Sequence, residues 1–161
     1  MTRNDLTNII LWIGLAAQIA MFLRVSWIDY HQHRIPNRLV APQTVGTCIW
    51  VILLGATSDD LGSAATSLLI GVAVAAIALT ISLATAGIGM GDVKLIAPLT
   101  VTLAWLGRNP GVIALLACCA AALLASGLSL ATGNGLSHRI ALAPILTIGL
   151  IAGTIALGLV Q

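Results

Sequence analysis

The chain has 161 residues, of which 59% are hydrophobic and only 7% are charged, and its formal net charge is +2. Soluble domains have about a quarter of their residues charged, so this composition excludes an ordinary soluble fold. The seven Lys and Arg residues form no basic patch, so the sequence gives no sign of nucleic-acid binding. We predict an all-α polytopic membrane protein that forms a single domain over residues 1–161.

Apolar runs in the sequence predict about six transmembrane helices, separated by polar or glycine-rich segments. Their approximate ranges are 8–28, 39–56, 65–86, 93–107, 111–132 and 140–160. The fourth run is short, so we expect it to start near the membrane surface. Cys48, Cys118 and Cys119 lie within apolar runs, and we interpret them as buried small residues. Close helix contacts are predicted at Gly71, Gly127, Gly149, Gly153 and Gly158.

The Lys and Arg residues of the short loops predict the orientation of the chain in the membrane. Placing the 24–38 loop in the cytoplasm puts five basic residues inside and two outside. The five are Arg24, Arg34, Arg38, Lys94 and Arg139, and the two are Arg3 and Arg108. Both termini and the loop with Asp59 and Asp60 are then expected outside the cytoplasm.

Acidic residues are few enough to be considered one by one. The chain has no Glu, and its carboxylates are Asp5, Asp29, Asp59, Asp60 and Asp92. Two spans separate Asp29 from Asp92, so these two are expected on the same face of the membrane, and the other three on the opposite face. Two neighbouring carboxyl groups can share a proton and so provide one acid and one base for splitting an amide with water. If two carboxylates of this chain cooperate on the cytoplasmic side, they are therefore Asp29 and Asp92.

The segments around the two aspartates suggest how each would act. Asp92 opens a helix, where negative charge is favoured, and Asp29 closes one, so we interpret Asp92 as the initial base and Asp29 as the initial acid, with the reverse left open. Alternating glycines before Asp92 leave space for an extended peptide at a substrate groove. Lys94 is two residues past Asp92 and belongs to another helix face. Pro36 fixes the turn after Asp29, and Asn37 can cap the second helix.

Two motifs together resemble the type IV prepilin peptidases, which are GxGD aspartic peptidases. Asp29 is followed by Arg34-Ile35-Pro36-Asn37, and Gly89-Met90-Gly91-Asp92-Val93-Lys94 fits the pattern GxGDxK. The similarity is greatest to the short Tad/Cpa-type forms, which lack the cysteine-rich insertion associated with methylation. Family-like features also include Leu95 to Ala97, Trp105-Leu106-Gly107 and Ala143-Pro144-Ile145-Leu146.

This resemblance implies an aspartic endopeptidase integral to the bacterial or archaeal cytoplasmic membrane, in contact with its lipids. Its expected substrates are prepilins or prepilin-like proteins of type IV pilus or secretion systems, which carry a short basic leader before a hydrophobic helix. Cleavage after a glycine at the cytoplasmic face is implied, with Asp29 and Asp92 as the catalytic pair. Candidate motif or substrate-groove residues are Gly89, Gly91, Lys94, Pro36 and Asn37. Without the two CxxC pairs of the longer members, we predict neither zinc nor S-adenosylmethionine as a cofactor.

Other interpretations remain open from the sequence. A small ion-coupled transporter or a non-catalytic membrane assembly factor could also carry two aspartates, but transporters place such charges near the bilayer midplane on broken helices. A broader GxGD protease would cut inside a membrane span of its substrate. His31-Gln32-His33, with His138 on the same predicted face, is interpreted as a solvated loop rather than a metal site, since closed sites need three or four ligands.

Overall fold

A computed structural model of the chain describes residues 2–32, 35, 37–85, 90–131 and 142–160. Within these ranges the chain forms six α-helices and no strand, which confirms the all-α prediction. In chain order the helices are α1 (Arg3–Gln32), α2 (Asn37–Ser58), α3 (Leu61–Thr85), α4 (Met90–Leu106), α5 (Arg108–Ala131) and α6 (Leu142–Val160). Each predicted apolar run therefore corresponds to one helix.

Five helices, α1 to α5, begin earlier than their apolar runs, and polar residues cap the extended starts of α1 and α3. At the start of α1, the Thr2 backbone N–H donates to the Asp5 carboxylate at 2.8 Å, and the Asp5 N–H donates to the Thr2 hydroxyl at 3.3 Å. This reciprocal arrangement is that of a capping box, and it extends α1 into the polar N-terminal segment. At the start of α3, Asp60 accepts a hydrogen bond from the Ser63 N–H at 3.0 Å and so caps the helix.

The surface of the bundle is apolar in the way that a transmembrane protein requires. Among the described residues, four helices are long and apolar enough to cross a membrane, namely α1, α2, α3 and α6. Large side chains such as Leu69, Leu83 and Leu159 are exposed on the outer faces of helices. Helix α4 has 17 residues and is the shortest, as the short fourth run predicts. The prediction that all three cysteines are buried is wrong, because Cys119 is exposed on α5 and the other two are half-buried.

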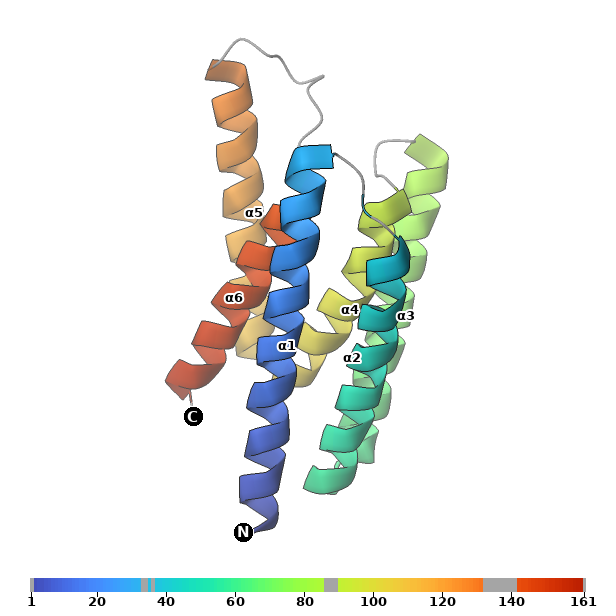
Figure 1. Ribbon diagram of the computed structural model, residues 1–161, viewed down its shortest axis with the longest axis vertical. Coiled ribbons are helices and arrows are strands. Elements are labelled where there is room, and N and C mark those ends of the chain that lie inside the picture. Colours follow the sequence, from blue (N-terminus) through green and yellow to red (C-terminus); the bar gives the residue numbers. More distant parts are fainter. Residues whose placement is uncertain (1, 33–34, 36, 86–89, 132–141, 161) are drawn as a thin grey trace.

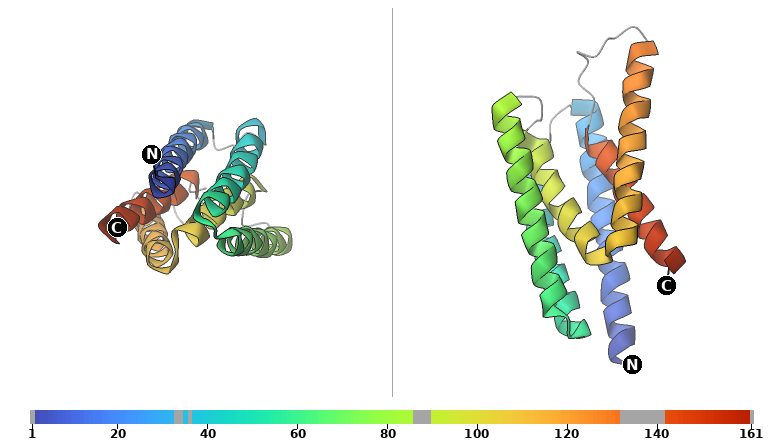
Figure 2. Two further views of the ribbon diagram at one scale, coloured as in Figure 1. Left: turned by 90° about the horizontal axis from the view of Figure 1, so that it is seen from below. Right: turned by 180° about the vertical axis from the view of Figure 1, so that it is seen from behind.

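The helices run alternately up and down (Figure 1), so one end of the bundle holds the end of α1 and the beginnings of α2, α4 and α6. We call this the site end. Helix α3 packs on α4 and α5 packs on α6, whereas α1 contacts both α2 and α6 (Figure 2). A hydrophobic cluster joins α1, α2, α4 and α6, and we call it the central cluster. Its buried members are Phe22, Val25, Val40, Leu95, Leu99, Ala143, Leu146 and Leu150.

The remaining described aspartates lie at the opposite end of the bundle, as the count of spans predicts. The Arg3 guanidinium forms an ion pair with Asp59 and donates hydrogen bonds to the carbonyl oxygens of Ala56 at 3.1 Å and Thr57 at 2.7 Å. These carbonyls belong to the last turn of α2, where a cation is favourable. Arg3 thus ties the start of α1 to the end of α2.

Small residues permit close helix contacts at most of the predicted positions. An added Cβ at Gly149 would lie 3.0 Å from the Ala114 carbonyl oxygen, and one at Gly153 would lie 3.0 Å from the Leu103 Cδ2. Gly71 is packed against Val101 in the same way, whereas Gly158 has only an ordinary contact of 3.6 Å with Trp12. Gly127 lies outside the residues whose surroundings the structure describes. The small-residue prediction is therefore confirmed for Gly71, Gly149 and Gly153.

Candidate active site

Asp29 lies on the buried face of α1, close to the end of that helix. It is only 6% exposed. Its Oδ2 accepts a hydrogen bond of 3.3 Å from the backbone N–H of Ala143. Ala143 is in the first turn of α6, where backbone N–H groups have no partner within their own helix. The N-terminus of α6 therefore hydrogen-bonds the Asp29 carboxylate and helps to fix its position.

Two buried hydroxyl groups fasten α1 to α6 one turn below this contact. The Ser26 and Thr147 hydroxyl oxygens are 2.6 Å apart. The Thr147 hydroxyl also lies within hydrogen-bond distance of the carbonyl oxygens of Ala143, at 2.9 Å, and Phe22, at 3.3 Å. The Thr147 hydroxyl has one proton to donate and can also accept one from Ser26, so the three groups form one network. This network fixes the position of α6 along the axis of α1. It thereby fixes the position of the Ala143 N–H that donates to Asp29.

Asp92 lies in the first turn of α4 and is half-buried, which confirms its predicted position at a helix start. Leu95 follows it by one turn and is fully buried in the central cluster. Val25 belongs to the same cluster and precedes Asp29 by one turn. Both aspartates therefore lie at the site end, within one turn of residues of the same packed cluster.

The two aspartates reach this end from helices whose backbones are not direct neighbours. Within the described ranges, α2 and α6 each contact both α1 and α4, but no Cα of α1 comes within 8 Å of a Cα of α4. The Cα atoms of Asp29 and Asp92 are therefore more than 8 Å apart. A pair held in this way can act on a group that lies between its members.

The two motifs touch each other through Ile35 and Gly91. A Cβ added to Gly91 would lie 2.8 Å from the Ile35 Cβ, which is closer than two carbon atoms approach without displacement. Only a glycine at position 91 lets α4 begin this close to the segment that joins α1 and α2. Ile35 was not predicted as a site residue, although its place between Asp29 and Pro36 in the first motif is a signal that could have identified it.

The N-terminus of α6 is the second feature that the sequence analysis missed. The stretch from Ala143 to Leu146 was noted as family-like, but without a role. Pro144 provides a usable signal, because proline is favoured in the first turn of a helix and so marks a helix start near residue 142. Five spans separate the N-terminus from this point, so α6 begins at the same end as Asp29.

The other predicted site residues are placed less fully. Lys94 is exposed and borders a hollow of about 380 Å³ between α2, α3 and α4. Gly89 and Pro36 lie outside the described residues, and so does the side chain of Asn37, although α2 begins at that residue.

Of the three histidines, only His31 belongs to the described part of the chain. Its Nδ1 lies 2.8 Å from the Trp27 carbonyl oxygen, and its ring packs on Trp27 with the ring centres 4.4 Å apart. His31 is therefore in the last turn of α1 and not in a loop, although it is exposed as expected of a solvated residue. His33 and His138 lie outside the described residues.

The contact between Asp29 and α6 changes the argument for which aspartate is the base. The predicted acid role of Asp29 rests on the end of α1, where the helix dipole is negative. The positive end of α6 lies at the same carboxylate and opposes that effect. Helix ends therefore no longer distinguish Asp29 from Asp92, and the assignment stays a prediction.

Comparison with known proteins identifies the family. The model of the type IV leader peptidase family matches residues 16–159, a range that includes both motifs and both aspartates. No curated protein and no solved structure matches the chain. Four apolar helices, the placement of Asp29 and Asp92 at one end and the contact between the two motifs all agree with this family match. The chain belongs to the type IV leader peptidase family.

Proposed function

We propose that the protein is an aspartic endopeptidase of the cytoplasmic membrane that removes the leader peptide from prepilins or prepilin-like proteins. Cleavage takes place at the cytoplasmic face, and Asp29 and Asp92 are the catalytic residues. The observation that carries this proposal is the position of the two carboxylates at one end of the bundle, beyond one shared cluster of packed side chains. Family membership supports the protease activity and the class of substrate.

The reaction needs only water and the two carboxyl groups. One aspartate, ionised, takes a proton from water as the water oxygen attacks the scissile carbonyl carbon. The other aspartate, protonated, donates a hydrogen bond and then its proton to the carbonyl oxygen. The first aspartate then passes the proton that it took from water to the amide nitrogen, and a hydroxyl group of the tetrahedral intermediate returns a proton to the second aspartate. The C–N bond breaks and leaves a carboxyl group on the leader and an amine on the mature protein. Both carboxyl groups then return to their starting state.

The arrangement of the helices supports a peptide that lies between the two carboxylates. Asp29 and Asp92 belong to helices whose Cα atoms stay more than 8 Å apart, and we place the scissile peptide between their carboxyl groups at the site end. The hydrogen bond from the Ala143 N–H helps to fix the position of the Asp29 carboxylate. A transporter would hold the two charges at the midplane of the bilayer, whereas both lie at helix ends in this chain.

The direct test is cleavage of a leader-bearing precursor by the purified full-length protein in detergent or liposomes. We expect Asp29→Asn and Asp92→Asn each to lower kcat by at least about 100-fold, which is the usual contribution of a general acid or base. Asp60→Asn is the matched control, because it makes the same change at the opposite end and Asn also caps helices. This control should cleave at the wild-type rate.

Two outcomes would contradict the proposal. Wild-type cleavage by either Asn variant at position 29 or 92, with normal membrane insertion, would exclude the catalytic pair. A product cut inside the hydrophobic helix of the precursor, rather than at the end of the leader, would indicate the broader class of GxGD proteases. Mass spectrometry of the new N-terminus distinguishes these products.

A further inference from the structure

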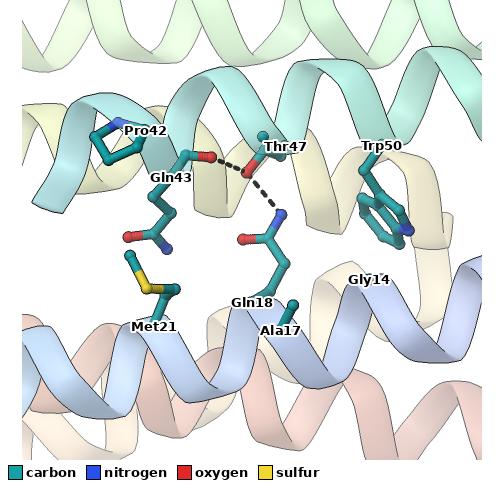
Figure 3. Close-up of a pocket in the computed structure, with 9 residues that line it drawn as sticks. Gly14, Ala17, Gln18, Met21, Pro42, Gln43, Thr47 and Trp50 are labelled. Carbon is teal, nitrogen blue, oxygen red and sulfur yellow. Dashed lines mark hydrogen bonds between the residues drawn. The ribbon is translucent and has the colours of Figure 1, made fainter.

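A hollow of about 230 Å³ lies between α1 and α2, away from the site end. Gln18 from α1 and Gln43 from α2 reach into it from the two helices, with Met21 toward one end and Trp50 toward the other (Figure 3). No residue that lines it is charged. The full lining consists of Gly14, Ala17, Gln18, Met21, Pro42, Gln43, Gly46, Thr47 and Trp50.

The amide groups in this hollow are buried and only partly hydrogen-bonded. Gln18 and Gln43 are each 6% exposed. The Gln18 Nε2 donates to the Thr47 hydroxyl at 2.6 Å, and that hydroxyl donates to the backbone carbonyl oxygen of Gln43 at 2.8 Å. The Gln18 Oε1 and both side-chain polar atoms of Gln43 have no partner among the described residues. Buried amides are normally paired, so these three atoms indicate a ligand that hydrogen-bonds to them.

The outer wall of the hollow is open and built from small residues. Ala17, Pro42 and Gly46 are exposed, and a Cβ added to Gly46 would meet no atom within 4 Å. Small residues let the backbone of another helix approach closely in a membrane. The hollow is therefore open sideways, between two helices that are long and apolar enough to span the bilayer.

The chemistry of the lining limits what can occupy the hollow. Lipid tails offer no donor or acceptor and would leave the amides unpaired. A charged group would find no counter-charge among the lining residues. An uncharged hydrogen-bonding side chain on an apolar helix satisfies both conditions, because its helix packs on Ala17 and Gly46 while its polar end pairs with Gln18 and Gln43.

The position of the hollow relative to Asp29 suggests which helix this is. The part of α1 that lines it runs from Gly14 to Met21, which is 15 to 8 residues before Asp29. At 1.5 Å per residue, this is about 12 to 22 Å along the helix axis. A membrane helix whose preceding leader reaches Asp29 would pass the hollow at this depth.

Resting on the proposed function, we propose that this hollow is a recognition pocket for the membrane helix of the substrate. It takes one carboxamide or hydroxyl side chain that lies about 8 to 15 residues beyond the scissile bond. Gln43 supplies a donor and an acceptor to that side chain, and Gln18 supplies an acceptor. Precursors with such a residue at this depth are cleaved at lower concentration than precursors with a wholly apolar helix.

The kinetic test uses designed precursors with a basic leader ending in glycine and a helix of about 20 Leu and Ala residues. One series carries a single Gln at successive helix positions, and the host carries none. With the full-length wild-type protein, KM should fall about tenfold for guests at the predicted depth, consistent with a buried hydrogen bond. Gln43→Leu should remove this advantage without changing kcat or the KM of the host. Gly46→Leu, which fills the hollow, should raise KM for host and guest alike.

Matched controls make the same kinds of change elsewhere. Thr80→Val removes an exposed polar group from α3, and Gly62→Leu adds a side chain where an added Cβ meets only Asp60 at 3.8 Å. Both should leave all KM values unchanged. A wild-type protein that cleaves host and guests with equal KM, or a Gln43→Leu variant that keeps the guest advantage, would overturn the pocket while leaving the proposed function intact.

A second measurement does not depend on cleavage. Benzoylphenylalanine in place of Ala17, at the rim of the hollow, should form a photo-cross-link to the guest helix more readily than to the host helix. This preference should disappear with Gln43→Leu. If the protein cleaves no precursor but the guest-dependent cross-link forms, the proposed protease function is excluded, whereas binding of a polar helix side chain in the hollow is supported. Equal cross-linking of host and guest means that water or lipid occupies the hollow, and the pocket proposal fails.

Discussion

The structure leaves no space for even a methyl group at position 91. The Gly91→Ala substitution would place a Cβ 2.8 Å from the Ile35 Cβ, and Ile35 cannot relieve this by rotating its side chain because its Cβ is fixed to the backbone. We expect the start of α4 to shift, and Asp92 with it. A displacement of about 1 Å at a catalytic group lowers the rate about 100-fold. Precursor cleavage by the purified variant measures the loss.

Two companion variants make the Gly91 prediction specific. Gly111→Ala adds the same methyl group in α5, where the nearest neighbour is the Leu103 carbonyl oxygen at an ordinary 3.6 Å, so it should retain full activity. Ile35→Ala keeps the Cβ that causes the clash and should not rescue Gly91→Ala. Recovery of activity in the double variant would mean that the outer atoms of Ile35 cause the loss, and the proposed contact would be wrong.

Helix α6 depends on a glycine for its contact with α5. The Gly149→Ala substitution would bring a Cβ against the Cys118 Sγ and to 3.0 Å from the Ala114 carbonyl oxygen. Overpacking of this kind costs about 1–3 kcal/mol, so the midpoint of thermal unfolding in detergent should fall. Gly158→Ala is the control in the same helix, since its added Cβ meets only Trp12 at 3.6 Å. It should unfold at the wild-type temperature.

Cys118 separates the two sources of strain in that contact. Replacing Cys118 by Ala removes the sulfur but leaves the Ala114 carbonyl in place. The double variant Cys118→Ala/Gly149→Ala should therefore recover part of the stability lost by Gly149→Ala, and a double-mutant cycle measures the coupling. Simple addition of the two single effects would show that the sulfur is not the obstacle.

Asp60 caps helix α3, and its contribution to the stability of the fold depends on pH. Hydrogen bonds from the Ser63 side chain and from its backbone N–H lower the pKa of the Asp60 carboxyl below its ordinary value of 3.8. The folded state therefore binds protons less readily than the unfolded state in this range. The stabilisation by Asp60 is complete above pH 3.8 and is lost as the pH falls through the lowered pKa.

Substitution of Asp60 tests this pH dependence. Asp60→Ala should unfold at a lower temperature than the wild type at pH 7, because the cap is lost. The difference should shrink at a pH well below 3.8, where the wild-type carboxyl is protonated. Asp60→Asn keeps a capping oxygen that does not titrate and should show no such pH dependence. An equal difference between wild type and Asp60→Ala at both pH values would contradict the assignment.

At the scale of the whole molecule, the sequence predicts those features that depend on one helix alone or on the number of helices. All six helices follow from apolar runs, because each helix in a membrane satisfies its own backbone hydrogen bonds. The common end of Asp29 and Asp92 follows from the even number of spans between them. Helix ends were predicted less well, since the Thr2 and Asp5 cap extends α1 beyond its apolar run.

Contacts between distant segments could not be predicted in the same way. The hydrogen bond from Ala143 to Asp29 joins residues 114 positions apart, and its existence depends on how α6 packs against α1. The closeness of Gly91 to Ile35 likewise depends on the packing of α4 on α2. Gln18 and Gln43 gave no signal, because isolated neutral amides within apolar runs have no spacing that distinguishes a pocket from ordinary packing.

The orientation of the whole bundle decides which compartment the site faces. Exposed Arg24, Arg38 and Lys94 lie toward the site end, whereas Arg3 and Arg108 lie at the opposite end. The excess of basic residues at the site end predicts that this end is cytoplasmic. Exposed residues Gln32, at the end of α1, and Gly62, at the start of α3, mark the two ends.

Cysteine labelling in intact cells tests this orientation, with Cys48, Cys118 and Cys119 replaced by Ala. A membrane-impermeant maleimide should label Gly62→Cys in intact cells and Gln32→Cys only after the membrane is permeabilised. Both variants should retain precursor cleavage, which shows that the labelled protein is folded. Labelling of Gln32→Cys in intact cells would place Asp29 and Asp92 outside the cytoplasm. Cleavage could then occur only after the leader had crossed the membrane, and the proposed cytoplasmic reaction would be excluded even if both aspartates proved catalytic.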